Sequence, residues 1–176
     1  MNDPWPPPGP SLNDFGGDWP KYYAHIYGRY TADFLAEKPS WPIEGKRFAI
    51  KQQPLVDGHC HTFWHIITEG EVEEEREVST DRCACVSWPR LILDEFSATY
   101  PSPRSERIVW WVEGRGGRTR FHICLSDFSY LVVVEDRPDY VLLWTAFPVD
   151  REHQRRRRRN AYEQYWAQQG KAKAAR

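Results

Sequence analysis

The stretch that decides the fold is RIVWWVEGRGGRTRFHICLSDFSYLVVVEDRPDYVLLWTAFPV, residues 107–149. It contains four runs rich in Val, Ile, Leu, Trp, Tyr and Phe, the residue types that favour β-strands. The runs are separated by GRGG, SD and EDRPD, which have the composition of tight turns. Because consecutive strands with short links usually pair with one another, the sequence predicts a four-stranded antiparallel sheet.

Helical segments are predicted before this sheet. Residues 21–37 carry apolar and aromatic side chains at spacings of three and four, which is typical of an amphipathic helix. A short helix is predicted over 57–70, ended by its final glycine, and a second helical or mixed segment over 86–96. Between the first two helices, residues 46–56 are expected to be extended and irregular.

A basic helix is predicted after the sheet, over residues 150–169. Tyr162, Tyr165 and Trp166 fall on one helical face, and the arginines lie elsewhere, so the helix is expected to pack back on the body. The predicted fold class is therefore α+β, with N-terminal helices followed by a four-stranded antiparallel sheet and a C-terminal basic helix.

The chain is expected to form one domain between two tails. Its 176 residues suffice for a single hydrophobic core. Residues 1–20 contain six prolines and three glycines without a periodic apolar face, which predicts a flexible tail. A single α+β domain is then expected over 21–169, and a second flexible tail over 170–176.

Composition and charge restrict the function classes. No run approaches the roughly 18 apolar residues of a membrane span, and the proline-rich start lacks the features of a signal peptide. We therefore expect a cytoplasmic protein with reduced cysteines and no membrane partner. Residues 151–176 carry nine Arg and Lys against two Glu, in a chain of net charge −1. An acidic body with a basic end favours an anionic partner, nucleic acid above all.

One face of the predicted sheet could hold such an anion. In RTRFHICL, residues 118–125, alternate side chains point to opposite faces, so the apolar ones separate from Arg120 and His122. With Thr145 from the fourth strand, these two residues would form an exposed binding surface for an anionic substrate. The alternative is that they are ordinary solvent-facing strand residues.

The histidine-rich stretch DGHCHTFWHIITEG, residues 57–70, leaves three interpretations open. On a helix His61, His65 and Glu69 would form one stripe, and the spacing of the two histidines allows both to bind one zinc ion. The histidine and cysteine just before them are further candidate ligands. The hydrolytic motif H-E-x-x-H is absent, however. The other interpretations are an exposed stripe without chemistry and a metal-free acid–base site.

Metal-free cleavage of RNA needs few groups. A base takes the proton of the 2′-hydroxyl, an acid protonates the leaving oxygen, and cations or hydroxyls hold the charge on the phosphate. Histidine suits both proton-transfer roles near neutrality, and the guanidinium group of arginine suits the phosphate.

Several motifs together resemble a known group of nucleases. These are DGHCHTFWHIITEG, SWPRLIL, WWVEGRGGRTR, DFSYLVVVEDRPDY, LLWTAF and the basic helix. They resemble phage and bacterial nuclease domains of the barnase, EndoU, colicin and RelE type, known as the BECR fold, over roughly residues 44–166. The resemblance implies metal-independent ribonuclease chemistry on the sheet surface. It implies His65 as acid or base, Arg120 as phosphate ligand and Thr145 as a donor to phosphate.

The chain departs from this pattern at two places. Phe147 stands where the resemblance leads us to expect a tyrosine, and Ala84 and Cys85 stand where a polar pair is expected. These departures leave open a domain that binds RNA without cutting it.

The leading functional hypothesis is therefore a toxin-like or phage-encoded ribonuclease that needs no metal or cofactor. Its candidate catalytic residues are His65, Arg120, Thr145, His61 and His122. The candidate RNA-binding residues are Arg82, Arg118, Arg155, Arg156, Arg158 and Arg159.

Two alternatives stay open at this point. One is a non-catalytic nucleic-acid-binding or regulatory module, and the other a zinc-dependent hydrolase that uses His61 and His65. The arginine run is most simply a solvated helix face. The glutamate-rich loop at 69–82 is a candidate surface for an antitoxin or immunity protein.

Overall fold

The computed structural model describes residues 4–174, apart from the side chain of Arg115, and confirms the α+β class. The main helices are α1 (Trp19–Thr31), α2 (His61–Ile67), α3 (Thr80–Ala84), α4 (Trp88–Thr99) and α5 (Glu152–Ala174). Short 3₁₀ helices lie at Leu12–Phe15 and Glu73–Glu75, and a π-helical segment, Ala32–Ala36, continues α1. The strands are β1 (Arg47–Ile50), β2 (Thr68–Glu69), β3 (Glu77–Val78), β4 (Ile108–Arg115), β5 (Arg118–Leu125), β6 (Tyr130–Asp136) and β7 (Tyr140–Pro148).

The main sheet has five strands in the order β1-β7-β6-β5-β4. The four strands β4 to β7 form the predicted antiparallel meander. The prediction of a purely four-stranded antiparallel sheet was wrong because β1 pairs in parallel with β7, from Arg47↔Tyr140 to Ile50↔Leu143. The segment expected to be irregular thus supplies an edge strand, and the sheet is mixed. A separate pair, β2 with β3, forms a small second sheet.

Two local features of the meander position side chains. Gly116 and Gly117 both have positive φ, 58° and 74°, which matches the two-residue turns that join antiparallel strands tightly. Between β6 and β7 the register shifts, because Val133 pairs with Thr145 while Val134 pairs with Leu143. The extra residue is Trp144. Such bulges redirect a side chain, and Trp144 is exposed at this point.

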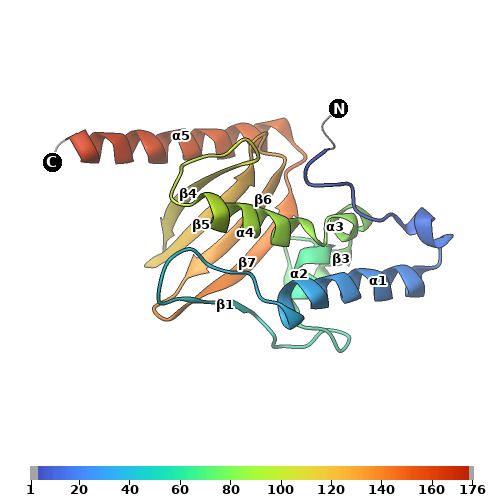
Figure 1. Ribbon diagram of the computed structural model, residues 1–176. Coiled ribbons are helices and arrows are strands. Elements are labelled where there is room, and N and C mark those ends of the chain that lie inside the picture. The colour runs from blue at the N-terminus through green and yellow to red at the C-terminus, as the bar shows by residue number, and fades with distance from the viewer. Residues whose placement is uncertain (1–3, 175–176) are drawn as a thin grey trace.

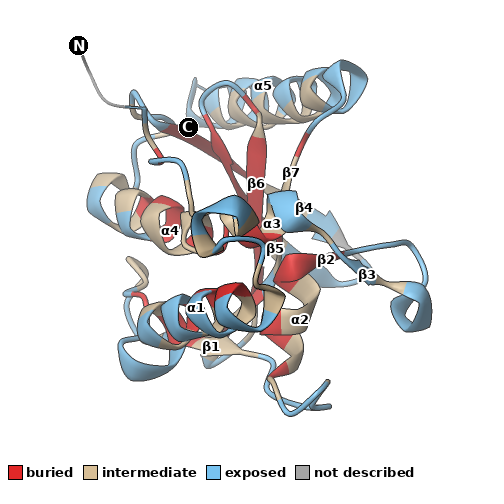
Figure 2. Cartoon of the chain, turned by 90° about the vertical axis from the view of Figure 1, so that its right-hand side faces the viewer, coloured by how far each residue is buried: buried red, intermediate tan, exposed pale blue. Residues whose placement is uncertain are grey.

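One face of the sheet is covered by α2 and α4, as the alternation of β5 predicts, and α1 packs on α2 through aromatic contacts with Phe63. Phe121, Ile123 and Leu125 lie in the larger core cluster with buried residues of these helices. Figure 1 shows α4 across this face, and Figure 2 shows buried residues along the strands and on the inward sides of α1 and α4. The burial of a large aromatic set is the main stabilising term of this layer.

The opposite face is only partly open, which corrects the prediction of an open basic surface. Trp111, Cys124 and Leu131 belong to a second buried cluster against which Tyr162 and Tyr165 of α5 pack. The packing predicted for the C-terminal helix is thus confirmed. The face also carries the acidic residues Glu113 and Glu135, because each pairs with Arg120 in the strand register.

The ends of α2 and α5 differ from the predictions. Helix α2 ends at Ile67, so residues 68–70 are not helical. Helix α5 continues to Ala174, five residues into the predicted tail 170–176, whose last two residues lie outside the described part.

At the other end, residues 1–3 of the predicted flexible tail also lie outside the described residues. The rest of that tail contacts the body. The hydroxyl of Tyr22 donates to the carbonyl of Pro10 at 2.9 Å, and Trp88 Nε1 donates to that of Pro7 at 3.0 Å. Within the described residues, none of the helices has the length and apolar character that crossing a membrane requires.

Candidate functional site

The two histidines of α2 lie on one side of a short helix. Thr62, Phe63 and Ile66 are buried in the core, which turns His61 and His65 away from it toward β7. Residues four apart on a helix lie one above the other. The two imidazole rings are accordingly nearly parallel, with centroids 5.9 Å apart and 14° between their planes.

A carboxylate from the glutamate-rich loop contacts both rings. Glu73 Oε1 lies 3.2 Å from His61 Nε2, and Glu73 Oε2 lies 3.7 Å from His65 Nδ1. The predicted stripe of His61, His65 and Glu69 is not formed, because α2 ends before Glu69, whose carboxylate faces Arg82 at 3.7 Å. Among residues 4–174, no three His, Cys, Asp or Glu side chains are arranged to hold a metal ion.

The loop folds back toward the histidines because Arg76 fastens it. This guanidinium donates to the carbonyls of His65, Thr68 and Gly70 at 2.5–3.2 Å. At Gly70 the chain has φ of 140°, and a Cβ atom there would lie 3.2 Å from the Cα of Arg76. Glycine therefore permits the close approach, and the glutamate-rich loop helps to build the site.

His61, Thr62, His65 and Glu73 line a pocket of about 240 Å³ between α2 and the middle of β7. Its wall on the sheet side is formed by Leu142, Leu143 and Trp144, and Lys51 adds a positive charge at its rim. Beyond Ile50, strand β1 no longer covers β7. The histidines therefore meet the sheet at the position where the bulge exposes Trp144.

Burial favours the neutral form of both imidazoles. Desolvation, with Arg76 nearby, lowers the pKa of His65 from 6.5 to about 4, although Glu73 opposes the shift. Desolvation and the Lys51 charge also lower the pKa of His61, again against Glu73. At neutral pH His65 can accept a proton, which is the requirement for a general base.

Arg120 reaches the same neighbourhood from β5. Its guanidinium carbon lies 4.3 Å from the ring centroid of Trp144, a cation–π contact. Its Nε and Nη2 atoms donate to Glu135 Oε2 at 3.0 and 2.8 Å. Glu135 is fully buried and also pairs with Arg137 at 2.5 Å and Arg118 at 3.6 Å. The carboxylate thus fixes the orientation of Arg120 beside Trp144.

The remaining candidate catalytic residues, His122 and Thr145, are absent from the lining of the histidine pocket. His122 is buried and stacks on Trp111 with ring centroids 5.1 Å apart. Its burial lowers its pKa to about 4, against the raising effect of Glu113. Thr145 is half-buried on β7, directly after Trp144 and opposite Val133.

The predicted RNA-binding arginines have different surroundings. Arg82 donates to the carbonyl of Thr68, and Arg155 to that of Val149, each at 2.7 Å. Arg159 lies over the ring of Phe128, and Arg158 is half-buried near Glu113. Arg118 is exposed beside Glu135. Arg156 is exposed in a groove between β4 and α5.

The lowered pKa values of half-buried His65 and buried His122 predict a loss of stability in acid. Unfolding releases His65 and His122 to a pKa of 6.5, so the unfolded state binds more protons than the folded state between about pH 4 and 6.5. The free energy of unfolding should therefore fall as the pH drops through this window, by up to about 1.4 kcal/mol per pH unit for each histidine. Urea unfolding of wild type and His122→Leu at several pH values measures this slope. An unchanged slope in the variant would contradict a neutral buried His122.

Comparison of the chain with models of protein families, with curated proteins and with solved structures returned no significant match. The site must therefore be interpreted from its geometry. The sequence predicts His61, His65 and Arg120 as site residues but does not single out Glu73, Trp144 and Glu135, which the structure places beside them. A signal existed for Glu135, because a single glutamate in the apolar run YLVVVED alternates onto the same face as Arg120 when the strands are paired.

Proposed function

We propose that the chain is a metal-independent ribonuclease whose active site is the pocket of His61 and His65. One observation carries the proposal: two parallel imidazoles share the Glu73 carboxylate and face an exposed tryptophan that contacts an arginine. Two proton-transfer groups, a surface on which a base can stack and a cation for the phosphate thus meet beside Trp144, near the middle of β7.

The roles follow from the surroundings of each group. His65 takes the proton of the 2′-hydroxyl as the 2′-oxygen bonds to phosphorus. His61, held at 3.2 Å from Glu73, gives its proton to the 5′-oxygen as the bond from phosphorus to that oxygen breaks. The products are a 2′,3′-cyclic phosphate and a free 5′-hydroxyl. Arg120 and Lys51 offset the charge on the phosphate, and Trp144 stacks on a neighbouring base.

The departure at Phe147 does not weaken this arrangement, because the histidine pair supplies both proton transfers without a tyrosine. The side chain of Phe147 instead contacts Arg82, whose guanidinium carbon lies 5.7 Å from its ring centroid.

The lowered pKa values predict an acidic optimum for cleavage. His65 must be unprotonated, a condition met above about pH 4, and His61 must be protonated, a condition lost above a pKa that lies below 6.5. The profile of kcat/KM against pH should therefore be bell-shaped, with its maximum between about 4 and 6.5. Because Glu73 raises both pKa values, Glu73→Gln should move the bell to lower pH. A displacement to higher pH, or none, would count against the assigned roles. Circular dichroism over the same range checks that both proteins stay folded.

A non-catalytic nucleic-acid-binding module is the second candidate. It is favoured by the exposed Arg156 and Arg157 beside aromatic and amide side chains between β4 and α5. It predicts salt-dependent binding without any product. The zinc hydrolase predicted as a third possibility would instead require metal bound at one ion per chain in the purified protein.

A further inference from the structure

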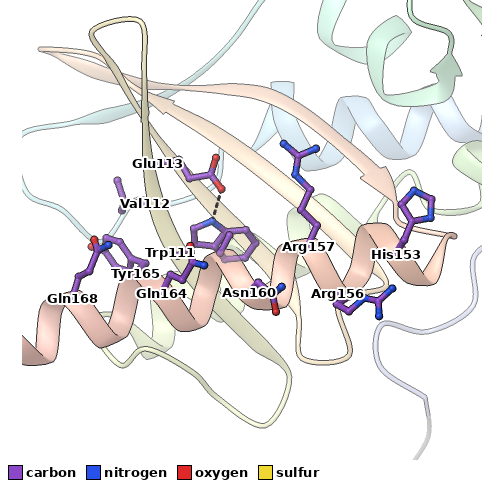
Figure 3. A pocket seen from close by; sticks show the side chains of 11 residues that line it. Trp111, Val112, Glu113, His153, Arg156, Arg157, Asn160, Gln164, Tyr165 and Gln168 are labelled. Atoms are coloured by element: carbon purple, nitrogen blue, oxygen red, sulfur yellow. Dashed lines mark hydrogen bonds between the residues drawn. The ribbon is translucent and has the colours of Figure 1, made fainter.

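A second hollow lies on the partly open face, between β4 and α5. It has a volume of about 590 Å³. Its strand wall is Trp111, Val112 and Glu113, and its helix wall comes from residues 153–168 of α5. Figure 3 shows Arg157 and Glu113 extending toward the same side of the helix, with Trp111 between helix and strand. We call this hollow the β4–α5 groove.

The groove exists because α5 is held at two separated points. Arg155 Nε donates to the carbonyl of Val149 at 2.7 Å near the start of the helix. Trp166 Nε1 donates to the carbonyl of Trp110 at 2.6 Å, about three turns later. Between these anchors the small side chain of Ala161 faces the strand, which leaves room above Trp111. The groove is therefore fixed by how α5 packs on β4.

The helix wall presents two rows of side chains. Residues four apart lie on one face of a helix. One row consists of Arg156, Asn160, Gln164 and Gln168, and the other contains His153, Arg157, Ala161 and Tyr165. Each row thus begins with a basic or titratable group and continues into amides or an aromatic ring.

This chemistry fits a single strand of nucleic acid better than an acidic peptide. Arginine forks match phosphate oxygens, and carboxamides both donate and accept, so they can bind the edges of unpaired bases. An acidic peptide would be bound by cationic side chains alone, and the carboxamides of the groove would have no part in recognising it. The one acidic side chain of the lining, Glu113, accepts from Trp111 Nε1 at 2.8 Å.

The groove is connected to the histidine pocket across the strands. Glu113 of the groove pairs in register with Arg120, which in turn pairs with Glu135 and contacts Trp144 of the pocket. From β4 to β7 there are three strand steps of about 4.8 Å, or about 14 Å. At about 3.4 Å per stacked nucleotide this span corresponds to about four nucleotides.

We propose that the β4–α5 groove binds the RNA strand about four nucleotides away from the phosphate that is cut in the histidine pocket. The RNA then crosses the strands of the sheet, passing Trp144 and Arg120 on its way from one site to the other. The position of the cut rests on the proposed function, whereas binding in the groove can be tested without any cleavage.

Binding of 2′-O-methyl oligonucleotides tests the groove, because they lack the attacking hydroxyl. Fluorescein-labelled strands of two, four and eight nucleotides are titrated with the full-length protein and followed by anisotropy. Wild type should bind the longest strand more tightly than the shortest. Arg156→Ala/Arg157→Ala should weaken the longest by about 10-fold and reduce its salt slope by about 1.4, since each lost phosphate contact contributes about 0.7. Binding of the shortest strand should not change.

A matched control removes the same charge from the same helix. Lys171→Ala/Lys173→Ala takes two positive charges from exposed positions outside the groove, and should change the affinity for the longest strand by less than about 2-fold. Equal losses in the two double variants would overturn the proposal, because they would reduce it to general charge attraction. Equal competition by an acidic peptide, deca-glutamate, would overturn it as well.

The two proposals fail in different ways. If the Arg156→Ala/Arg157→Ala variant loses length-dependent binding but wild type cuts no RNA, the groove stands and the ribonuclease proposal falls. If wild type cuts RNA but the double variant binds every strand like wild type, the ribonuclease stands and the groove falls.

Discussion

Replacing His65 by alanine should reduce kcat/KM for RNA cleavage by at least about 100-fold, because a general base contributes a factor of this order or more. The neutral imidazole of His65 faces the pocket beside Glu73 and Trp144, and no other described histidine of the pocket except His61 could take the proton. The measurement is the initial rate of cleavage of a doubly labelled RNA oligonucleotide at the pH optimum of the wild type. His61→Ala should cause a loss of similar size.

Two controls separate chemistry from folding. His25 is exposed on α1, so His25→Ala should keep the wild-type rate. Urea unfolding of His65→Ala should show a cooperative transition, since the side chain is partly accessible and its removal leaves the buried core of α2 in place. A folded His65→Ala protein that still cuts RNA at the wild-type rate would refute the role given to this histidine.

The second large effect concerns the buried carboxylate of Glu135. Glu135→Ala should lower the free energy of unfolding by about 3–5 kcal/mol, the usual cost of breaking a buried ion pair by removing one partner. Three arginines, Arg118, Arg120 and Arg137, would then lie close together without their shared counter-ion. Urea unfolding monitored by tryptophan fluorescence measures the change.

Two further variants serve as controls for the Glu135→Ala measurement. Glu163→Ala removes an exposed glutamate of α5 and should cost less than about 0.5 kcal/mol. Arg120→Leu/Glu135→Leu replaces the closest pair by apolar groups and should recover part of the loss. If Glu135→Ala were no less stable than Glu163→Ala, Glu135 would not be the group that holds Arg120 in position.

The meander could be predicted from sequence because each of its strands carries its own local pattern and its turns are short. Strand β1 could not, because its four residues RFAI pair with a strand more than 90 positions away and show no alternation of their own. Its parallel pairing makes the sheet mixed. It also ends at Ile50, where the histidine pocket begins, so the missed strand is the one that bounds the site.

The two histidines of the candidate site could be picked out from the sequence, but the residues that contact them could not. The spacing of His61 and His65 predicts two imidazoles on one face of a helix, whatever the fold. Glu73 lies in a run of glutamates in which no residue is distinguished by sequence. It reaches the histidines only because the bonds from Arg76 to the carbonyls of His65 and Thr68 fold the loop back toward α2. Trp144 is exposed by a bulge that strict alternation along β7 does not anticipate.

If the histidine pocket cuts RNA by attack of the 2′-oxygen, the fragments must carry the ends that this chemistry leaves. The most direct measurement incubates the wild-type protein and His65→Ala with total RNA, each with and without EDTA, and determines the ends of the fragments by mass spectrometry. We expect fragments with 2′,3′-cyclic phosphate and 5′-hydroxyl ends from wild type in both conditions, and none from the variant. Intact RNA with wild type, cleavage that EDTA abolishes, or the same fragments from His65→Ala would contradict the account.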